Sequence, residues 1–235
     1  NRIFIFNSYK SKTMKKISKI LIVSISIILF LVSCKESSGK KQKKDTNIEN
    51  EKTDIKTVAV LNANLATESD LIALGLSSEL IAKIIAFRPY ESMTDFNEII
   101  KGKDTEELFK KIFVPFNLNT TAEVDFKMIP GIGNRMAHEF EEYRPYTSIK
   151  QFKREIGKYV DENEVSRYLN YVFVPVELNT STEDDIKSLP GVGNRISHEF
   201  IEYRPYINLT QFRKEIGKYV DKKELKRLER FVYLK

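Results

Sequence analysis

Two short glycine-containing segments hold the residues whose types and spacing point to chemistry. Each has the pattern Pro-Gly-x-Gly-Asn-Arg, at residues 130–135 and again at residues 190–195. Two glycines one residue apart allow a positive φ and a close approach of the backbone, so a helix that follows them begins with outward-pointing N–H groups and the positive end of its dipole. Such a helix start is a phosphate site, and the adjacent arginine would add positive charge.

Helices on both sides are expected to position these segments. After each segment, apolar residues recur at i, i+4 and i+7, which is the spacing of a buried helix face, and Arg-Pro then ends the helix. The stripes, including that of a more divergent first copy, are Leu80, Ile84 and Phe87; Met136, Phe140 and Tyr143; and Ile196, Phe200 and Tyr203. Before the segments, Thr120 with Glu123 and Thr180 with Glu183 have the spacing of a capping box, which predicts a short helix there.

Internal repetition is the strongest feature of the chain. Residues 178–232 restate residues 118–172 at a fixed offset of 60, and the first copy carries the related motif Phe87-Arg88-Pro89-Tyr90. No segment of useful length alternates with period two, so we expect an all-α fold of short helices. The three units are residues 57–115, 116–175 and 176–235, and each is so small that adjacent copies are expected to pack together.

The segment Ile129-Pro130-Gly131-Ile132-Gly133-Asn134-Arg135 and its copy at residues 189–195 resemble the helix-hairpin-helix motif. With Leu-Asn-Thr before it, Tyr-Arg-Pro after it and a second, degenerate hairpin around Gly157 or Gly217, each unit is similar to the double helix-hairpin-helix domain of ComEA-type competence proteins. The resemblance covers residues 61–235. It is weakest in the first copy, where Gly75-Leu76-Ser77 replaces Gly-x-Gly.

This resemblance implies that the hairpin amides hold the phosphate backbone of double-stranded DNA without sequence specificity. The implied contact residues are Gly131, Gly133, Asn134 and Arg135 in the second unit, and Gly191, Gly193, Asn194 and Arg195 in the third. The third unit is the stronger candidate, because it has 12 Lys and Arg against 10 Asp and Glu. The second has eight against nine and the first has six against nine.

The last helical stretch offers a second basic surface. Lys223, Arg227 and Arg230 share one face at helical spacing, which indicates either a phosphate-facing strip or a solvated polar face.

The hairpins also have a purely structural interpretation, since Pro-Gly-x-Gly is a good turn between packed helices. Glu139 and Glu142 lie on the same helix face as Arg135, and Glu199 and Glu202 repeat this arrangement behind Arg195. These acidic side chains would repel the phosphates of DNA and could instead pair with the arginines. The alternative function is therefore a non-catalytic protein-interaction or structural repeat module that has lost DNA binding.

Charge and composition argue against several other classes. The net charge of +6 arises within the first 56 residues, because residues 57–235 have 26 Lys and Arg against 28 Asp and Glu. The basic balance is therefore no evidence for nucleic-acid binding by the repeats. His138 and His198 each lack a neighbouring Cys or second His, and no nucleophile triad or phosphate-loop lysine is present, so we expect no metal, no cofactor and no enzyme activity.

The N-terminal region has the layout of a bacterial lipoprotein leader. A basic run at residues 14–19 precedes an apolar run at 20–32, and Leu31-Val32-Ser33-Cys34 resembles a lipobox. We expect residues 1–33 to be upstream residues plus a cleaved signal peptide, Cys34 to be lipidated, and residues 34–56 to be a flexible tether. Lys35 follows the cysteine where a retention signal would place Asp, which favours a lipid anchor in the outer membrane, facing the periplasm of the cell envelope, with envelope proteins as further partners.

Overall fold

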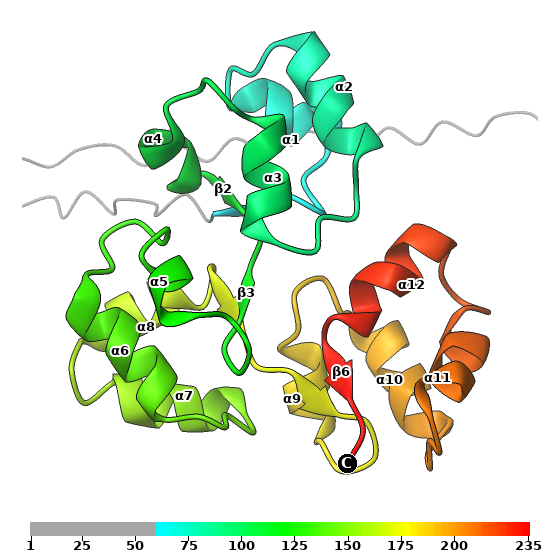
Figure 1. The fold of residues 1–235 in the computed structure, drawn as a ribbon. Helices are drawn as coiled ribbons and strands as arrows, with labels where there is room; N and C mark the ends of the chain where they lie inside the picture. Colours follow the sequence, from blue (N-terminus) through cyan, green and yellow to red (C-terminus); the bar gives the residue numbers. More distant parts are fainter. Residues whose placement is uncertain (1–59) are drawn as a thin grey trace, which may run out of the picture. The chain divides into compact units, whose positions relative to one another are not determined.

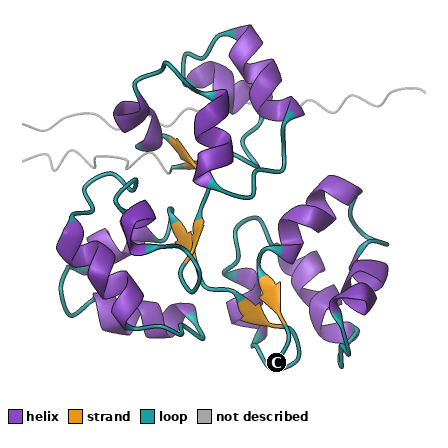
Figure 2. Cartoon of the chain, in the orientation of Figure 1, coloured by secondary structure: helices purple, strands orange, loops and turns teal. Residues whose placement is uncertain are grey.

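Short helices joined in hairpins make up most of the structure. The computed structural model describes residues 60–235, and the twelve helices in that range have four to nine residues each (Figures 1 and 2). The order strand, four helices, strand occurs three times, in repeat 1 (residues 60–115), repeat 2 (116–175) and repeat 3 (176–235).

The bounds of the elements follow the same order in each repeat. In repeat 1 they are β1 (Leu61–Asn62), α1 (Glu68–Ala73), α2 (Ser78–Ala86), α3 (Met93–Ile99), α4 (Thr105–Phe109) and β2 (Ile112–Phe113). In repeat 2 they are β3 (Phe116–Asn117), α5 (Glu123–Phe126), α6 (Asn134–Glu142), α7 (Ile149–Ile156), α8 (Glu162–Tyr168) and β4 (Val172–Phe173). In repeat 3 they are β5 (Val176–Glu177), α9 (Glu183–Lys187), α10 (Asn194–Glu202), α11 (Leu209–Ile216), α12 (Lys222–Glu229) and β6 (Val232–Tyr233).

Each repeat is closed by its two strands, which the expectation of an all-α fold missed. β1 pairs in parallel with β2, β3 with β4, and β5 with β6. In repeat 2 the register places Phe116 opposite Val172 and Asn117 opposite Phe173. Each pairing spans only two residues, which is too short for a period-two pattern to be recognised in the sequence.

An asparagine, an arginine and a tyrosine fix the start of each repeat to the end of its second helix. In repeat 1, Asn64 Nδ2 donates to the Tyr90 carbonyl at 3.0 Å, and the Tyr90 N–H donates back to Asn64 Oδ1 at 2.7 Å. Arg88 donates to the carbonyls of Ala63 and Ala66 at 2.8 and 2.7 Å. The same bonds recur with Asn119, Arg144 and Tyr146 and with Asn179, Arg204 and Tyr206. We call this arrangement the Asn-Arg-Tyr bracket, and it gives the Arg-Pro-Tyr motif a structural role.

Aromatic rings fill the cores of the repeats. In repeat 2, Phe140 lies edge-on to Phe126, Phe152 and Tyr168, with 5.3 Å between ring centroids in each pair. Phe140 is fully buried, as is its counterpart in repeat 3, so the centre of the predicted stripe is confirmed. The prediction that Phe87 belongs to the buried face is wrong, because Phe87 is 63% exposed. The segment between α3 and α4 contains no tyrosine to cover it, unlike the corresponding segments of the other repeats.

The predicted capping boxes are wrong by two residues. α5 follows Ala122, which makes no side-chain cap, and α9 is capped by Thr182, whose side chain accepts from the Asp185 N–H. The physical reason is clear in repeat 3, where Thr180 is used by the preceding turn. Its N–H and its hydroxyl both donate to Glu177 Oε2, at 2.8 Å each, so its side chain is not available to the helix.

Aromatic residues at the junctions pack neighbouring repeats together, as expected for units of this size. Phe113 at the end of repeat 1 lies 5.1 Å from Phe116 and 5.0 Å from Tyr171, both of repeat 2, measured between ring centroids. Phe173 at the end of repeat 2 lies 4.7 Å from Phe231 of repeat 3.

The predictions for the leader, the lipidated Cys34 and the tether concern residues that lie outside the described range. Within residues 60–235, no helix combines the length and the apolar character needed to span a membrane.

Candidate functional site

The loops before α6 and α10 share one backbone conformation. Gly131 has a φ of +80° and Gly191 a φ of +72°, a left-handed conformation that favours glycine. Gly133 and Gly193 have extended backbones with φ near −90° (−93° and −91°), so only the first glycine of each pair is needed for its φ. Beyond the adjoining residues, nothing lies within 4 Å of the position of a Cβ at Gly133 or Gly193. The second glycine therefore leaves the start of the helix uncovered.

α6 and α10 begin without a side-chain cap, because their N-cap residues are glycines. Of the twelve helices in the described range, nine have a side-chain cap, and the remaining uncapped one is the four-residue α5. The first N–H groups of a helix have no partner within it, which leaves those of Asn134, Arg135 and Met136 in α6 for an outside acceptor. Together with the positive end of the helix dipole, these amides can bind an oxyanion.

The polar residues predicted to flank the hairpin amides are exposed: Asn134, Arg135, Asn194 and Arg195. The guanidinium carbon of Arg135 lies 5.6 Å from the ring centroid of Tyr159, and that of Arg195 lies 5.6 Å from the ring centroid of Tyr219. No carboxylate in residues 60–235 lies within ion-pair distance of either arginine. Both guanidinium groups can therefore take up an anion beside the helix start.

The acidic residues that follow Arg135 on α6 and Arg195 on α10 do not pair with these arginines. The purely structural interpretation of the hairpins is therefore left without the ion pairs that it invoked. Glu142 Oε2 lies 3.5 Å from His138 Nε2, and Glu202 Oε2 lies 3.3 Å from His198 Nε2. Glu139 is 9% exposed, and its Oε2 has no hydrogen-bond partner within the described part of the chain. The equivalent oxygen of Glu199 is in the same state.

The predicted basic strip on the last helix is not a continuous exposed surface. Lys223 is exposed, but Arg227 is only 2% exposed and its guanidinium donates to the Pro190 carbonyl and to Glu224. Sequence reasoning misassigned this residue because its partner is 37 residues away. In repeat 2, Arg167 likewise donates to the Pro130 carbonyl, at 2.8 Å, so these two arginines brace the hairpins from behind.

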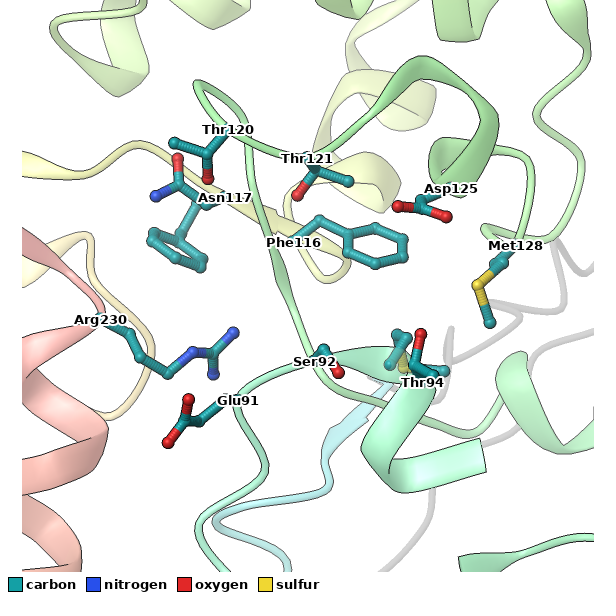
Figure 3. A pocket seen from close by; sticks show the side chains of 12 residues that line it. Glu91, Ser92, Thr94, Phe116, Asn117, Thr120, Thr121, Asp125, Met128 and Arg230 are labelled. Atoms are coloured by element: carbon teal, nitrogen blue, oxygen red, sulfur yellow. The ribbon is translucent and has the colours of Figure 1, made fainter. Parts of the chain in front are cut away.

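Arg230, the third residue of the predicted strip, is directed into the molecule. It donates to the carbonyls of Tyr90 and Pro115 at 3.1 and 3.3 Å, and burial lowers its pKa to about 10. It also lines a pocket of about 280 Å³, together with Glu91, Phe116 and other residues of repeats 1 and 2 (Figure 3). No residue of the two glycine segments lines this pocket, so it is separate from the hairpins.

The two hairpins differ in how much space surrounds them. A Cβ placed on Gly191 would lie 2.5 Å from Leu65 Cδ1 of repeat 1, whereas a Cβ on Gly131 would approach only Arg167 Nη2, at 3.4 Å. The balance of charged residues favours anion binding at the hairpin of repeat 3, as the sequence indicated. The open space around Gly131 favours anion binding at the hairpin of repeat 2.

The degenerate second hairpin of each repeat is closed to anions by its own side chains. Asp161 accepts from the Glu164 N–H at 2.9 Å, and Asp221 accepts from the Glu224 N–H at 2.8 Å. A capping carboxylate occupies the place an anion would take and repels it. The candidate site is therefore confined to the first hairpin of repeats 2 and 3.

Searches of protein families, of curated proteins and of solved structures find no match for this chain.

Proposed function

We propose that this chain binds double-stranded DNA through its phosphate backbone, without sequence specificity, by the first hairpins of repeats 2 and 3. In this proposal the three repeats are tandem double helix-hairpin-helix units, of which the first has lost its site. The observation that carries it is the uncapped start of α6 and of α10, each beside an exposed arginine that has no carboxylate partner in the described region.

The proposed contacts are mostly backbone N–H groups, which fits recognition of a phosphate rather than of a base. The amides of residues 133–136 and 193–196 would donate to phosphate oxygens, and Arg135 and Arg195 would add a charge-assisted bond each. Asn134 and Asn194 would donate from their side-chain amides. Arg167 and Arg227 would keep the hairpins rigid behind these contacts.

Binding is expected to be weak. With two hairpins, about two to four phosphates are neutralised, so log K should fall with log salt at a slope of roughly −2 to −4. The near-neutral balance of residues 57–235, with 26 Lys and Arg against 28 Asp and Glu, adds no long-range attraction.

We further propose that the protein is a non-catalytic lipoprotein of the bacterial cell envelope, anchored by a lipid at Cys34 in the outer membrane and facing the periplasm. The support is the basic run, the apolar run and the Leu-Val-Ser-Cys sequence at residues 31–34. In that place the repeats would capture DNA in the periplasm, as in the ComEA-type proteins that the units resemble.

Fluorescence anisotropy of a labelled DNA duplex tests the proposal, with the full chain kept in a nonionic detergent because of its apolar leader. Reversal of both hairpin charges in the R135E/R195E variant should weaken binding about tenfold at low salt and make the salt slope shallower. The control K150E/K222E makes the same charge change at exposed lysines of α7 and α12 and should have a small effect. Equal losses in the two variants would contradict hairpin recognition.

A second candidate function is protein interaction through repeat 1, where two large apolar side chains are exposed. Phe87 is 63% exposed and Ile72 is 59% exposed. Repeat 1 could therefore contact an envelope protein while repeats 2 and 3 hold DNA. Crosslinking in intact cells at position 87, compared with exposed position 163 as the control, would detect such a partner; equal yields at the two positions would argue against it.

A further inference from the structure

A pair of tyrosines lies beside each of the two candidate hairpins. Tyr143, at the end of α6, and Tyr159, between α7 and α8, place their hydroxyl oxygens 2.7 Å apart. In repeat 3, Tyr203 and Tyr219 repeat this contact at 2.8 Å. We call these contacts the tyrosine pairs. Each pair joins the helix that follows the first hairpin to the segment between the last two helices of the same repeat.

The second tyrosine of each pair carries the arginine of the hairpin. The Arg135 guanidinium carbon lies 5.6 Å from the centroid of the Tyr159 ring, and Arg195 lies at the same distance from that of Tyr219. Both arginines are exposed, and no carboxylate in residues 60–235 lies within ion-pair distance of either. An aromatic face attracts a guanidinium group and restricts its movement. The ring is therefore the contact that determines where each arginine stands before a ligand arrives.

The first tyrosine of each pair keeps the second one in place. In repeat 2 both tyrosines are half-buried, and the bond between their hydroxyls fixes the orientation of Tyr159 relative to α6. The ring of Tyr143 has Lys158 Nζ 4.9 Å from its centroid, and this lysine also pairs with Glu155. Repeat 3 has the same contacts through Tyr203, Lys218 and Glu215. Since α6 begins at the hairpin, the contacts from α6 through the tyrosine pair to Arg135 lead back to the helix start.

We propose that the second tyrosine of each pair, Tyr159 or Tyr219, is a positioning residue, whose ring holds the hairpin arginine beside the uncapped helix start. The part of this inference that concerns DNA affinity rests on the proposed function. The tyrosines do not touch the ligand. They act through the arginines, because an arginine that is already ordered loses less rotational freedom when it binds a phosphate.

Repeat 1 lacks every member of this arrangement. In the alignment on the Arg-Pro-Tyr motif, Arg135 corresponds to Glu79, and Tyr143 corresponds to Phe87, which has no hydroxyl. The segment between α3 and α4 contains no tyrosine, and α2 is capped by its own Ser77. The tyrosine pair is thus present in the two repeats with an uncapped second helix and absent from the repeat in which that helix is capped.

The free protein provides the first test, by NMR of the full chain in nonionic detergent with isotope-labelled arginine. Relaxation of the Nε–H groups measures how ordered each arginine side chain is, and the R135K and R195K variants assign the two signals. In Y159L/Y219L both side chains should lose their order, because the rings that hold them are gone. The conservative variant Y159F/Y219F keeps the rings and should retain most of the order. Unchanged order in Y159L/Y219L would overturn the proposal.

DNA affinity provides the second test, by a double-mutant cycle between tyrosine and arginine. In the wild-type background, Y159L/Y219L should weaken binding by about two- to tenfold per site, the cost of immobilising a flexible side chain on binding. The salt slope should stay the same, because the variant changes no charge. In the R135A/R195A background, the same two substitutions should have no further effect, since no arginine is left to position.

Three results of the cycle would overturn the proposal. Equal losses in both backgrounds would mean that the tyrosines act without the arginines. Unchanged or tighter binding by Y159L/Y219L would mean that the rings do not help the arginines to reach the ligand. The control Y233L removes the ring of a half-buried tyrosine in β6, outside both tyrosine pairs, and should leave the affinity unchanged. A loss in Y233L as large as that in Y159L/Y219L would also contradict a specific role of the pairs.

Failure of the positioning role and failure of the proposed function give different results. If R135A/R195A binds DNA as tightly as the wild type, hairpin recognition fails, and the order of the arginines in the free protein alone decides whether the rings position them. Circular dichroism checks that each variant is folded. If Y159L/Y219L does not fold, Y159M/Y219M replaces it, because methionine fills irregular space without a ring. The same losses of order and affinity then support the proposal, and their absence overturns it.

Discussion

Repeat 1 and repeat 2 have the same scaffold but different helix starts. Both have the Asn-Arg-Tyr bracket and a first glycine with a positive φ, Gly75 at +75° and Gly131 at +80°. In repeat 1, however, the Ser77 side chain accepts from the Leu80 N–H and so caps α2, and the next residues bring in Glu79. In repeat 2 the corresponding residues are Gly133 and Arg135. The fold is therefore independent of the candidate anion site. Of the differences between the two hairpins, Ser77 in place of Gly133 adds the cap, and Glu79 in place of Arg135 reverses the charge.

The largest expected effect concerns the scaffold that the repeats share. The substitution N119A leaves the backbone N–H and carbonyl of Tyr146 without partners and should lower the free energy of unfolding by about 2–3 kcal/mol, the cost of unsatisfied buried polar groups. N64A should have a similar effect in repeat 1, because its bracket makes the same bonds. Denaturant unfolding measures both.

The control for this prediction is N163A, which changes an exposed asparagine of α8. It should alter the free energy of unfolding by less than about 0.5 kcal/mol. If N64A proved neutral while N119A was strongly destabilising, the repeats would not share one scaffold.

The next effect concerns the second glycine of the open hairpins. The variant G133S/G193S gives α6 and α10 the cap that Ser77 gives α2, so the serine oxygens accept from the amides that would hold a phosphate. Stability should rise by a few tenths of a kcal/mol per helix, because serine is a slightly better N-cap than glycine. DNA affinity should fall about threefold, since one amide per site is lost to the ligand.

Thermal unfolding and anisotropy measure these two opposite changes in the same samples. S77G is the matched control, because it removes a natural cap in repeat 1 and should slightly destabilise the protein without weakening DNA binding. An unchanged DNA affinity in G133S/G193S would show that the uncapped amides do not contact the ligand.

The smallest expected effect is the conversion of repeat 1 into an open hairpin. S77G/E79R provides the missing glycine and arginine while the positive φ is already present at Gly75. In the R135E/R195E background, where remaining binding is weak, the added hairpin should raise DNA affinity about twofold. E106R makes the same charge change on the exposed surface of α4 and serves as the control. A gain of equal size in both variants would mean that charge alone is responsible.

The features that could be predicted from the sequence were local ones. The glycine segments, the helices on either side and the buried Phe140 and Phe200 all follow from spacing within about ten residues. The tiny strands and the burial of Arg227 could not be predicted, because each depends on a partner far along the chain. The cap at Thr182 was within reach of the sequence, because Thr182 and Asp185 also have capping-box spacing. Recurrence at offset 60 of Glu164 with Arg167, and of Glu224 with Arg227, was the signal that could have identified the hairpin braces.

Lys158 and Tyr159 show how much of the candidate site could be predicted from the sequence. Their copies Lys218 and Tyr219 lie in the repeated Gly-Lys-Tyr-Val-Asp segment, so repetition marked them as constrained. Their contacts with Arg135 and Tyr143 join residues 15 or more positions apart, and no helical or strand period predicts such a pairing.

The most direct test of the central claim is a titration of the isotope-labelled full chain, in nonionic detergent, with a short DNA duplex, followed by amide chemical shifts. The account predicts that the largest shifts occur at the amides of residues 133–136 and 193–196, while those of residues 77–80 in the capped hairpin of repeat 1 stay in place. Shifts that spread evenly over the surface lysines, or that centre on repeat 1, would contradict recognition of phosphate by the uncapped helix starts.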